Sequence, residues 1–391
     1  ACVYAKVNIT TDNNHLLMQI AQDIAKKHGL RCLLHEKPFA GVNGSGKHDN
    51  WSVITNTGIN LFNPGKNPEE NKPFLAALAC TIKAVDEYAE ILRMSIASAG
   101  NDHRLGANEA PPAIISMFLG EELDKVVEDI CTGKKSDHEE IGRFDTGVSV
   151  VPTFSKDNTD RNRTSPFAFT GNKFEFRAIE GGKSFEEVVK EFISKHKRII
   201  FNGDGYSAEW EEEAKRRGLP NHKNTVDALK CLKDPKYIDM LDRQGVYTKV
   251  EIASRYEILL DNYIKTIQVE ALTAVKMVKT QIYPAACDYL AKVSSEVVAA
   301  KEAGIPAAFL TEDATKLATL LQEAKDKLTT LEDNISKAQN NDAEIFEVAT
   351  MWRDDVFGIM QSLRETIDTI EELVDDSYWP IPTYVDLLFG I

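Results

Sequence analysis

Residues Asn43 to Ser52 read Asn-Gly-Ser-Gly-Lys-His-Asp-Asn-Trp-Ser, and the rest of the chain is interpreted outward from them. Glycine lets the backbone approach a ligand closely, and a neutral imidazole such as that of His48 is a common metal ligand. The amides and hydroxyls can bind polar substrates without adding charge. Taken alone, the stretch would also fit a surface turn. Arginine- and carboxylate-rich stretches further along the chain favour a ligand-binding loop.

The composition is typical of a globular protein. The chain has 391 residues, of which 43% are hydrophobic and 27% are charged, and this length predicts two or three domains. A net charge of −15 argues against nucleic acid or an anionic membrane as the main partner. No apolar run could span a bilayer, and no signal peptide is visible. Six scattered cysteines without a Cys-x-x-Cys pair favour buried free thiols in a reducing compartment over a disulfide framework or a zinc site.

Residues 1–205 mix helical and strand patterns, which predicts an α+β region. A hairpin is predicted at Asn56-Thr57-Gly58, because asparagine and glycine tolerate left-handed backbone. Apolar spacing predicts one long helix from Pro73 to about Ala99. Its buried face would contain Leu75, Leu78, Ile82, Val85 and Leu92. The other predicted elements are a helix from Thr11 to about Gly29, a buried strand Cys32–Leu34, a strand Ile114–Leu119, a helix Glu121–Cys131, strands within 145–155 and 165–180, and a helix from the capping box Ser184–Glu187 to about His196.

Residues 206–391 have helical periodicity almost throughout. The expected helices cover Arg255–Lys279, a segment with Leu317, Leu320, Ala324, Leu328, Leu331 and Ile335 on one face, and Glu344–Val374. The three-four spacing of the second segment favours an antiparallel helical hairpin with a helix–helix core. The aromatic, proline-rich tail from Trp379 to Tyr384 is predicted to pack back on the body as an extended segment.

Three further stretches carry polar groups suited to catalysis. His103-Arg104-Leu105-Gly106-Ala107-Asn108-Glu109-Ala110-Pro111 is predicted to be a loop, and Asp160–Pro166 places two arginines in a polar turn. In the predicted strand Lys173-Phe174-Glu175-Phe176-Arg177, the charged residues share one face and the phenylalanines the other. Solvated surface charges would explain each stretch singly. Together they supply a histidine and a carboxylate for a divalent cation and arginines for carboxylate or phosphate, the set that phosphoryl transfer to an acid substrate requires.

These stretches, in this order, resemble glutamine synthetase, and in particular its type III branch. The run from His35-Glu36-Lys37-Pro38 into Asn43–Ser52 resembles the family's glycine-rich signature, and His103–Pro111 resembles its Arg…Glu-Ala-Pro segment. The other similar segments are Asn162-Arg163-Thr164, Phe174-Glu175-Phe176-Arg177, Ser254-Arg255-Tyr256, Val269-Glu270-Ala271-Leu272 and Tyr378-Trp379-Pro380. The similarity therefore extends over nearly the whole chain.

The resemblance implies a role for individual residues. His48 and Glu175 would bind Mg²⁺ or Mn²⁺, and Asn43, Gly44, Arg104 and Arg177 would bind glutamate. Glu109 would close over the site and help deprotonate ammonium. Arg163 would stabilise the transferring phosphoryl group. Asn50, Ser52 and Arg163 would contact ATP. The implied reaction phosphorylates the glutamate side chain with ATP, and ammonia then displaces the phosphate to give glutamine.

Two positions depart from the family pattern, and a larger part of the family's site has no counterpart. Asn50 stands where much of the family has a second histidine, and Ala168 stands where a second arginine is usual. The family's other metal-binding glutamates and its N-terminal β-grasp domain lie before the segment that resembles Asn8–Met18. Residues 1–205 are therefore interpreted as the C-terminal part of a glutamine synthetase catalytic β-barrel domain, and residues 206–391 as a type III helical extension.

The resemblance implies that the parent enzyme is a cytoplasmic homo-oligomer that forms a double hexameric ring. It also implies that the 391-residue segment alone is inactive. Two alternatives remain open at this stage. One is a ligase that joins glutamate to an amine other than ammonia. The other is a non-catalytic protein that keeps the fold for assembly or regulation.

Overall fold

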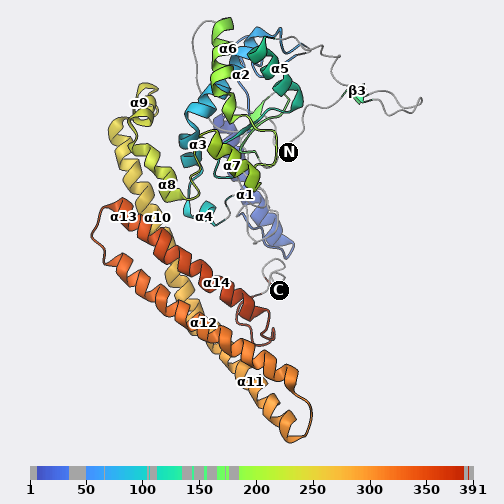
Figure 1. Cartoon of the computed structure of the whole chain (residues 1–391), viewed down its shortest axis with the longest axis vertical. Helices are drawn as coiled ribbons and strands as arrows, with labels where there is room; N and C mark the ends of the chain where they lie inside the picture. Colours follow the sequence, from blue (N-terminus) through green and yellow to red (C-terminus); the bar gives the residue numbers. More distant parts are fainter. Residues whose placement is uncertain are drawn as a thin grey trace, which may run out of the picture. The chain divides into compact units, whose positions relative to one another are not determined.

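The computed structural model describes residues 7–34, 50–65, 67–103, 105, 112–133, 143–144, 154–155, 165–171, 173–175, 185–382 and 386. The chain forms two compact units. We call residues 36–256 the mixed unit, and residues 1–35 with 257–391 the helical unit (Figure 1). The expected boundary between a catalytic part and a helical extension at residues 205 and 206 stays a prediction.

A small mixed sheet lies in the mixed unit. Its strands are β1 (Asn50–Trp51), β2 (Met117–Phe118), β5 (Phe167–Phe169) and β6 (Phe174–Glu175), in the order β1-β6-β5-β2. β6 is antiparallel to both β1 and β5, whereas β5 is parallel to β2. A second, two-stranded sheet pairs β3 (Arg143–Phe144) with β4 (Phe154–Ser155). The described part of the unit is therefore α+β, with much less strand than helix.

The hairpin predicted after β1 is confirmed. Ile54 bridges Asn60 in antiparallel fashion, and the Thr55 amide donates to the Ile59 carbonyl at 2.9 Å. Gly58 has φ 88°, a left-handed conformation that costs glycine no Cβ clash. The hairpin returns the chain to Phe62, which is buried in the core.

The predicted helix from Pro73 to Ala99 is three helices instead of one. They are α2 (Lys72–Glu87), α3 (Ala89–Ser95) and α4 (Ala99–Asp102). The breaks follow from local capping: Tyr88 leaves helical geometry at φ −117°, and the Ser98 side chain accepts from the Asn101 amide. The predicted buried face is correct, because all five of its apolar residues are buried. Periodicity located the core face but not the interruptions.

The mixed unit contains further helices and turns after β2. They are α5 (Glu121–Thr132), α6 (Phe185–His196), the 3₁₀ turn η1 (Lys197–Ile199), α7 (Ala208–Arg216), α8 (Thr225–Leu229), the 3₁₀ turn η2 (Lys230–Lys233) and α9 (Pro235–Arg243). α6 packs against α2 and α5, while α8 and η2 pack against α3. α5 and α6 match the predicted helices closely. The strand predicted over Ile114–Leu119 is shorter, because only β2 pairs.

The helical unit is built on long amphipathic helices. α10 (Lys249–Met277) continues through the π-helical segment η3 (Val278–Ile282) into α11 (Tyr283–Glu302), and α12 (Ala308–Gln339), α13 (Ile345–Met351), the π-helical segment η4 (Trp352–Phe357) and α14 (Gly358–Glu371) follow. α12 packs against both α11 and α14 (Figure 1). Of the predicted α12 stripe, Leu320 is half-buried, and the other five residues are buried: Leu317, Ala324, Leu328, Leu331 and Ile335. The antiparallel hairpin of α11 and α12 is confirmed.

α1 (Val7–Lys27) begins four residues before the predicted Thr11 and ends as expected. Gly29 has φ 70°, and the Leu30 amide donates to the Ala25 carbonyl at 2.9 Å, which closes the last turn. The buried strand predicted at Cys32–Leu34 is wrong: these residues have no strand partner among those described, and Leu33 is 43% exposed. An apolar run alone did not distinguish a strand from an exposed connection.

Candidate active site

Strand pairing brings the end of the glycine-rich stretch beside the strand that carries Glu175. In β1 and β6 the paired residues are Asn50 with Glu175, and Trp51 with Phe174. On its other side, Glu175 pairs with Ala168 of β5. Residue 175 thus lies in an inner strand, between Asn50 and Ala168. Two of the stretches singled out in the sequence therefore meet in the fold.

An aromatic cluster holds β1 and β6 in this register. The Phe174 ring lies 4.9 Å from that of Phe62 in an edge-to-face arrangement, and about as close to Phe167 and Phe169, at 5.1 Å each. The Trp51 ring contacts Phe62 at 5.1 Å. Such pairs each add roughly 1 kcal/mol beyond the burial of their area. Phe174 is fully buried, so the prediction that the apolar side of this strand faces the core is confirmed at Phe174, whereas Phe176 lies outside the described residues.

Alternation along the strands separates polar from aromatic residues. Asn50 and Ser52 are two residues apart, so they share one face of extended chain. Asn50 is exposed, and Ser52 and Lys173 are half-buried. The polar edge of this stretch is therefore open to solvent at Asn50.

Most other predicted site residues lie outside the described residues. For Glu175 the structure describes the backbone but not the side chain. The residues concerned are Asn43, Gly44, His48, Arg104, Glu109, Arg163 and Arg177. Their roles stay predictions. Among the residues that the structure does describe, no group of three or more histidine, cysteine, aspartate or glutamate side chains could hold a metal ion.

Sequence reasoning missed a polar cluster around Glu90 of α3. His222 Nε2 lies 2.8 Å from Glu90 Oε1, and the Tyr237 hydroxyl donates to Glu90 Oε2. Burial raises the pKa of Glu90, but hydrogen bonds from Tyr237 and His222 outweigh that effect, so its pKa is lower than usual. Burial also raises the pKa of Cys231, beside Glu90, to about 12, which keeps the thiol protonated. The cluster binds α3 to residues 222–237.

A second missed cluster joins α2 to the end of α6. His196 Nδ1 lies 2.7 Å from Asp86 Oδ2, and Arg198 Nε donates to Asp86 Oδ1 at 2.8 Å. The Asp86 and His196 side chains are both almost fully buried. No spacing in the sequence signals these contacts, because the partners are 110 and 112 residues apart. Both clusters hold the fold together, and neither involves a predicted ligand residue.

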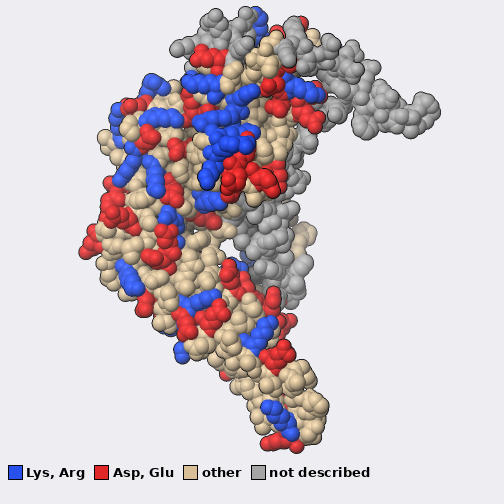
Figure 2. Space-filling view, viewed as in Figure 1, with Lys and Arg blue, Asp and Glu red and all other residues tan. Residues whose placement is uncertain are grey.

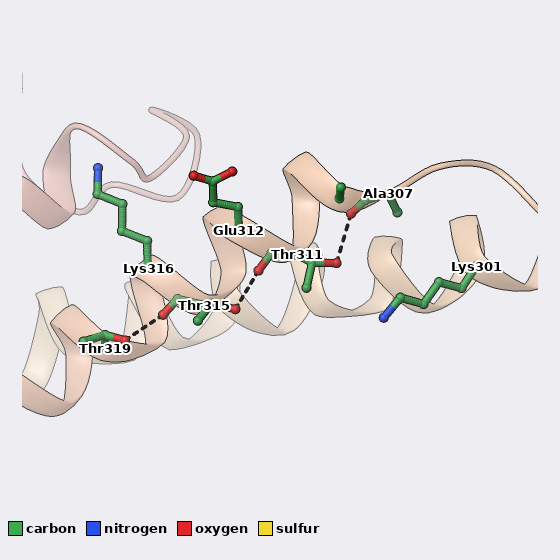
Figure 3. A pocket seen from close by; sticks show the side chains of 8 residues that line it. Lys301, Ala307, Thr311, Glu312, Thr315, Lys316 and Thr319 are labelled. Atoms are coloured by element: carbon green, nitrogen blue, oxygen red, sulfur yellow. Dashed lines mark hydrogen bonds between the residues drawn. The ribbon is translucent and has the colours of Figure 1, made fainter.

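A shallow hollow of about 670 Å³ lies between α11 and α12, in the helical unit. Figure 3 shows three threonines of its wall, each with its hydroxyl turned back onto the carbonyl four residues earlier in the chain. The pairs are Thr311 with Ala307, Thr315 with Thr311, and Thr319 with Thr315, at 2.7–2.9 Å. These hydroxyls are satisfied within the helix. The hollow contains none of the predicted site residues.

Charge on the visible face is mixed in sign. Figure 2 shows basic and acidic side chains interspersed over both units. The α11–α12 end is mostly uncharged, and Val298, Ile305 and Phe309 are exposed there. No helix in the described part of the chain is long and apolar enough to cross a bilayer.

Two family models match segments of this sequence, and three relatives match its whole length. The family model of the glutamine synthetase catalytic domain matches residues 2–116, and that of the glutamine synthetase C-terminal domain matches residues 184–301. A glutamine synthetase of Butyrivibrio fibrisolvens is 43% identical over all of this chain and 61% of its own length. A type-3 glutamine synthetase of Dictyostelium discoideum is 39% identical over all of the chain and 58% of its own length. A glutamine synthetase of Bacteroides fragilis is 36% identical, with 59% of its length covered. The chain thus spans about three fifths of the length of these relatives.

Proposed function

Because the chain belongs to the glutamine synthetase family, we propose that the protein that contains it forms glutamine from L-glutamate, ammonia and ATP. Identity of 36–43% over the whole chain carries this proposal. The pairing of Asn50 with Glu175 supports it, since it joins two stretches to which the reaction assigns ligands.

The proposed reaction has two steps. The side-chain carboxylate of glutamate attacks the γ-phosphorus of ATP, which releases ADP and forms γ-glutamyl phosphate. Ammonia then attacks the acyl carbon, and inorganic phosphate leaves. A carboxylate is a poor electrophile until one oxygen becomes a good leaving group, so the first step makes the second possible. Glu109 would accept a proton from ammonium and so supply the neutral nucleophile.

The donor chemistry of His48 and Glu175 suits a divalent cation, Mg²⁺ or Mn²⁺. Carboxylate oxygen is the preferred ligand of both ions, and imidazole is compatible with Mn²⁺. Residue 175 pairs with residue 50, only two positions from His48 in the sequence. When bound, the ion would neutralise charge on the phosphates. His48 and Glu175 would hold it beside ATP.

The remaining residues would bind and orient the substrates. Arg104 and Arg177 would pair with the carboxylates of glutamate, for which the planar guanidinium is suited. Asn43 and Gly44 would contact the same substrate. Arg163, with Asn50 and Ser52, would contact ATP. Arg163 would also stabilise the charge that spreads over the transferring phosphoryl group.

We also propose a larger architecture for the parent protein. Residues 1–205 would be the C-terminal part of a catalytic β-barrel, and residues 206–391 a helical extension whose tail packs back on it. The aliphatic face of α1 supports a larger parent protein. Its residues Leu16, Leu17, Ile20 and Ile24 are 43–58% exposed. An exposed apolar face of this kind marks a surface that another part of a protein covers. The parent protein would assemble as a double hexameric ring in the cytoplasm. Its mass in solution, measured by light scattering, tests the ring.

The test of function uses the full-length protein that contains this chain. We expect glutamine and phosphate to form in equal amounts from glutamate, ammonium and ATP with Mg²⁺ or Mn²⁺. Glu175→Gln is expected to lower the rate on the order of a hundredfold, because it removes a charged ligand at the phosphoryl group. The matched control is Glu212→Gln, at an exposed position of α7, which should retain the wild-type rate.

Other outcomes would select the alternatives. Faster turnover with polyamines than with ammonium would indicate a ligase for another amine. Absence of turnover together with no binding of ADP or Mn²⁺ would indicate a non-catalytic protein. Equal rates for the Glu175→Gln and wild-type proteins would contradict the metal role of Glu175 while leaving the overall reaction in place.

A further inference from the structure

The end of the α11–α12 hairpin, residues 298–319, presents apolar side chains to solvent, and we call it the hairpin end. Val298, Ile305 and Phe309 are 56%, 59% and 65% exposed, and Figure 2 shows little charge there. The shallow hollow between the two helices lies at the same end. Single exposed apolar residues are ordinary, whereas several together beside a hollow mark a surface for contact.

The turn of the hairpin has a defined geometry. Gly304 has φ 70°, its amide donates to the Lys301 carbonyl at 3.1 Å, and the Ile305 amide donates to the Ala300 carbonyl at 2.8 Å. These are the two hydrogen bonds of a Schellman motif, in which an apolar residue at the position of Ile305 commonly packs back on the helix. Ile305 is 59% exposed instead. The turn therefore holds an isoleucine outward.

Other elements of the helical unit pack on the hairpin away from its turn. Lys327 Nζ donates to the Thr366 hydroxyl of α14 at 2.8 Å, and the Tyr289 ring contacts that of Tyr378, after α14, at 5.4 Å. Figure 1 shows the hairpin continuing beyond the end of α14. The exposed fraction of Phe309 shows that the described residues leave the hairpin end uncovered.

The chemistry of the hollow does not suit a small polar ligand. The hydroxyls of Thr311, Thr315 and Thr319 are bonded to carbonyls within the chain at 2.7–2.9 Å, so they are not available to hold a ligand. Burying these threonines against apolar groups would leave no unpaired donor. The hollow is therefore suited to apolar side chains of a protein.

Two opposite charges on α12 make the hairpin end self-complementary. Glu312 and Lys316 are exposed, and Figure 3 shows that they project to the same side of α12, one turn apart. Neither forms an ion pair with a described residue. When a second copy lies antiparallel across a two-fold axis midway between them, Glu312 of each copy faces Lys316 of the other. The same axis sets Phe309 opposite Thr319, which lines the hollow.

We propose that the hairpin end binds the hairpin end of a second copy of this chain, with the two α12 helices antiparallel across a two-fold axis. The inference goes beyond the proposed function, since it assigns a surface to self-association and no residue to catalysis. The α12 wall of the hollow runs from Ala308 to Thr319, about 17 Å of helix. One such contact is smaller than the roughly 800 Å² per partner of a standard interface. We therefore expect it to be weak alone and stronger where several act together in an assembly.

The test reverses these charges in the full-length protein that contains this chain. Sedimentation over a range of concentrations, at low ionic strength, measures the self-association constant. We expect Glu312→Lys and Lys316→Glu each to lower it on the order of tenfold, because like charges then face each other twice. The double variant Glu312→Lys/Lys316→Glu should restore it, since the exchanged charges pair again.

Two further variants complete the test. Phe309→Asp removes the exposed ring and should weaken association by a similar factor. Its circular dichroism should match the wild type, because the side chain is 65% exposed. The matched control is Lys337→Glu, which makes the same charge change as Lys316→Glu at an exposed position near the other end of α12. It should leave the association constant unchanged.

The outcomes separate this inference from the proposed function. Unchanged association in both single charge variants would overturn the inference. Weaker association in the single variants without recovery in the double variant would overturn the second copy as the occupant and indicate a different protein on this surface. Glutamine formation is measured in parallel. An inactive wild-type protein whose association follows the expected pattern would contradict the proposed function and leave this inference in place.

Discussion

At the scale of single residues, buried and half-buried charges are stabilised by partners that are distant in the sequence. Glu90 is bonded to His222 and Tyr237, 132 and 147 residues away. Asp102 is bonded to Thr225 over 123 residues. Each contact closes a long loop, so it forms only once the surrounding apolar core has brought the partners together. Single-residue chemistry in this protein is therefore a consequence of the fold.

The lowered pKa of Glu90 predicts how the stability of the protein changes as the pH falls. Its pKa in the folded protein lies below the usual 4.5, so its contribution to the free energy of unfolding is present above pH 4.5 and is lost as the pH falls through the lowered pKa. In Glu90→Gln this component of the acid-induced loss should be absent. Chemical denaturation at a series of pH values measures it. The exposed Glu191→Gln variant should follow the wild-type curve, and a parallel curve for Glu90→Gln would refute the assignment.

At the scale of elements, amphipathic stripes explain which helices were predictable. The α12 stripe is covered by α11 and α14. The α1 stripe has the same periodicity, but Leu17 is 51% exposed. Periodicity in the sequence shows that one face of a helix is apolar. Whether that face is buried depends on which neighbouring elements pack against it.

One substitution made in both helices tests this contrast. Leu331 of α12 is fully buried, so Leu331→Ala should lower the free energy of unfolding of the helical unit by about 2–5 kcal/mol. Leu17→Ala in α1 should change it by less than about 0.5 kcal/mol. Urea denaturation followed by circular dichroism gives both values. A large loss in Leu17→Ala would mean that the α1 stripe is covered within this chain.

At the scale of the whole molecule, the chain consists of two compact units whose division falls within α10, between residues 256 and 257. Each unit has a core of its own. Aromatic rings around Phe174 dominate the sheet of the mixed unit. Leucines, alanines and Trp352 fill the helical unit. Units with separate cores are expected to unfold separately.

Calorimetry of the chain should therefore resolve two transitions. Phe174→Ala removes a fully buried ring, so the free energy of unfolding of the mixed unit should fall by about 3–5 kcal/mol. The calorimetric transition of that unit should therefore move to a lower temperature. Leu331→Ala should lower the temperature of the helical-unit transition only. Phe309→Ala, at a side chain that is 65% exposed, should move neither. A single transition that shifts in both core variants would show that the units unfold as one.

The sequence by itself determined the local features of this protein. The hairpin at Asn56–Gly58, the buried face that begins at Leu75 and the α12 stripe depend on residues three or four positions apart or on a single turn, so they can be predicted from spacing. The polar residues that resemble an enzyme site were recognised from their types and order. Of these, the part tested by the described structure is the inward orientation of Phe174 beside Glu175.

The tertiary structure decided which distant residues meet. It alone placed Asn50 opposite Glu175, divided the predicted helix after Glu87, left Leu33 exposed, and enclosed Asp102 with Arg93 and Thr225. Spacing carries no information on such contacts, because closing a long loop is favourable only when many apolar groups are buried at once. The fold is therefore predictable where its interactions are local, and the contacts of Asp102 with Arg93 and Thr225 could be found only in the folded chain.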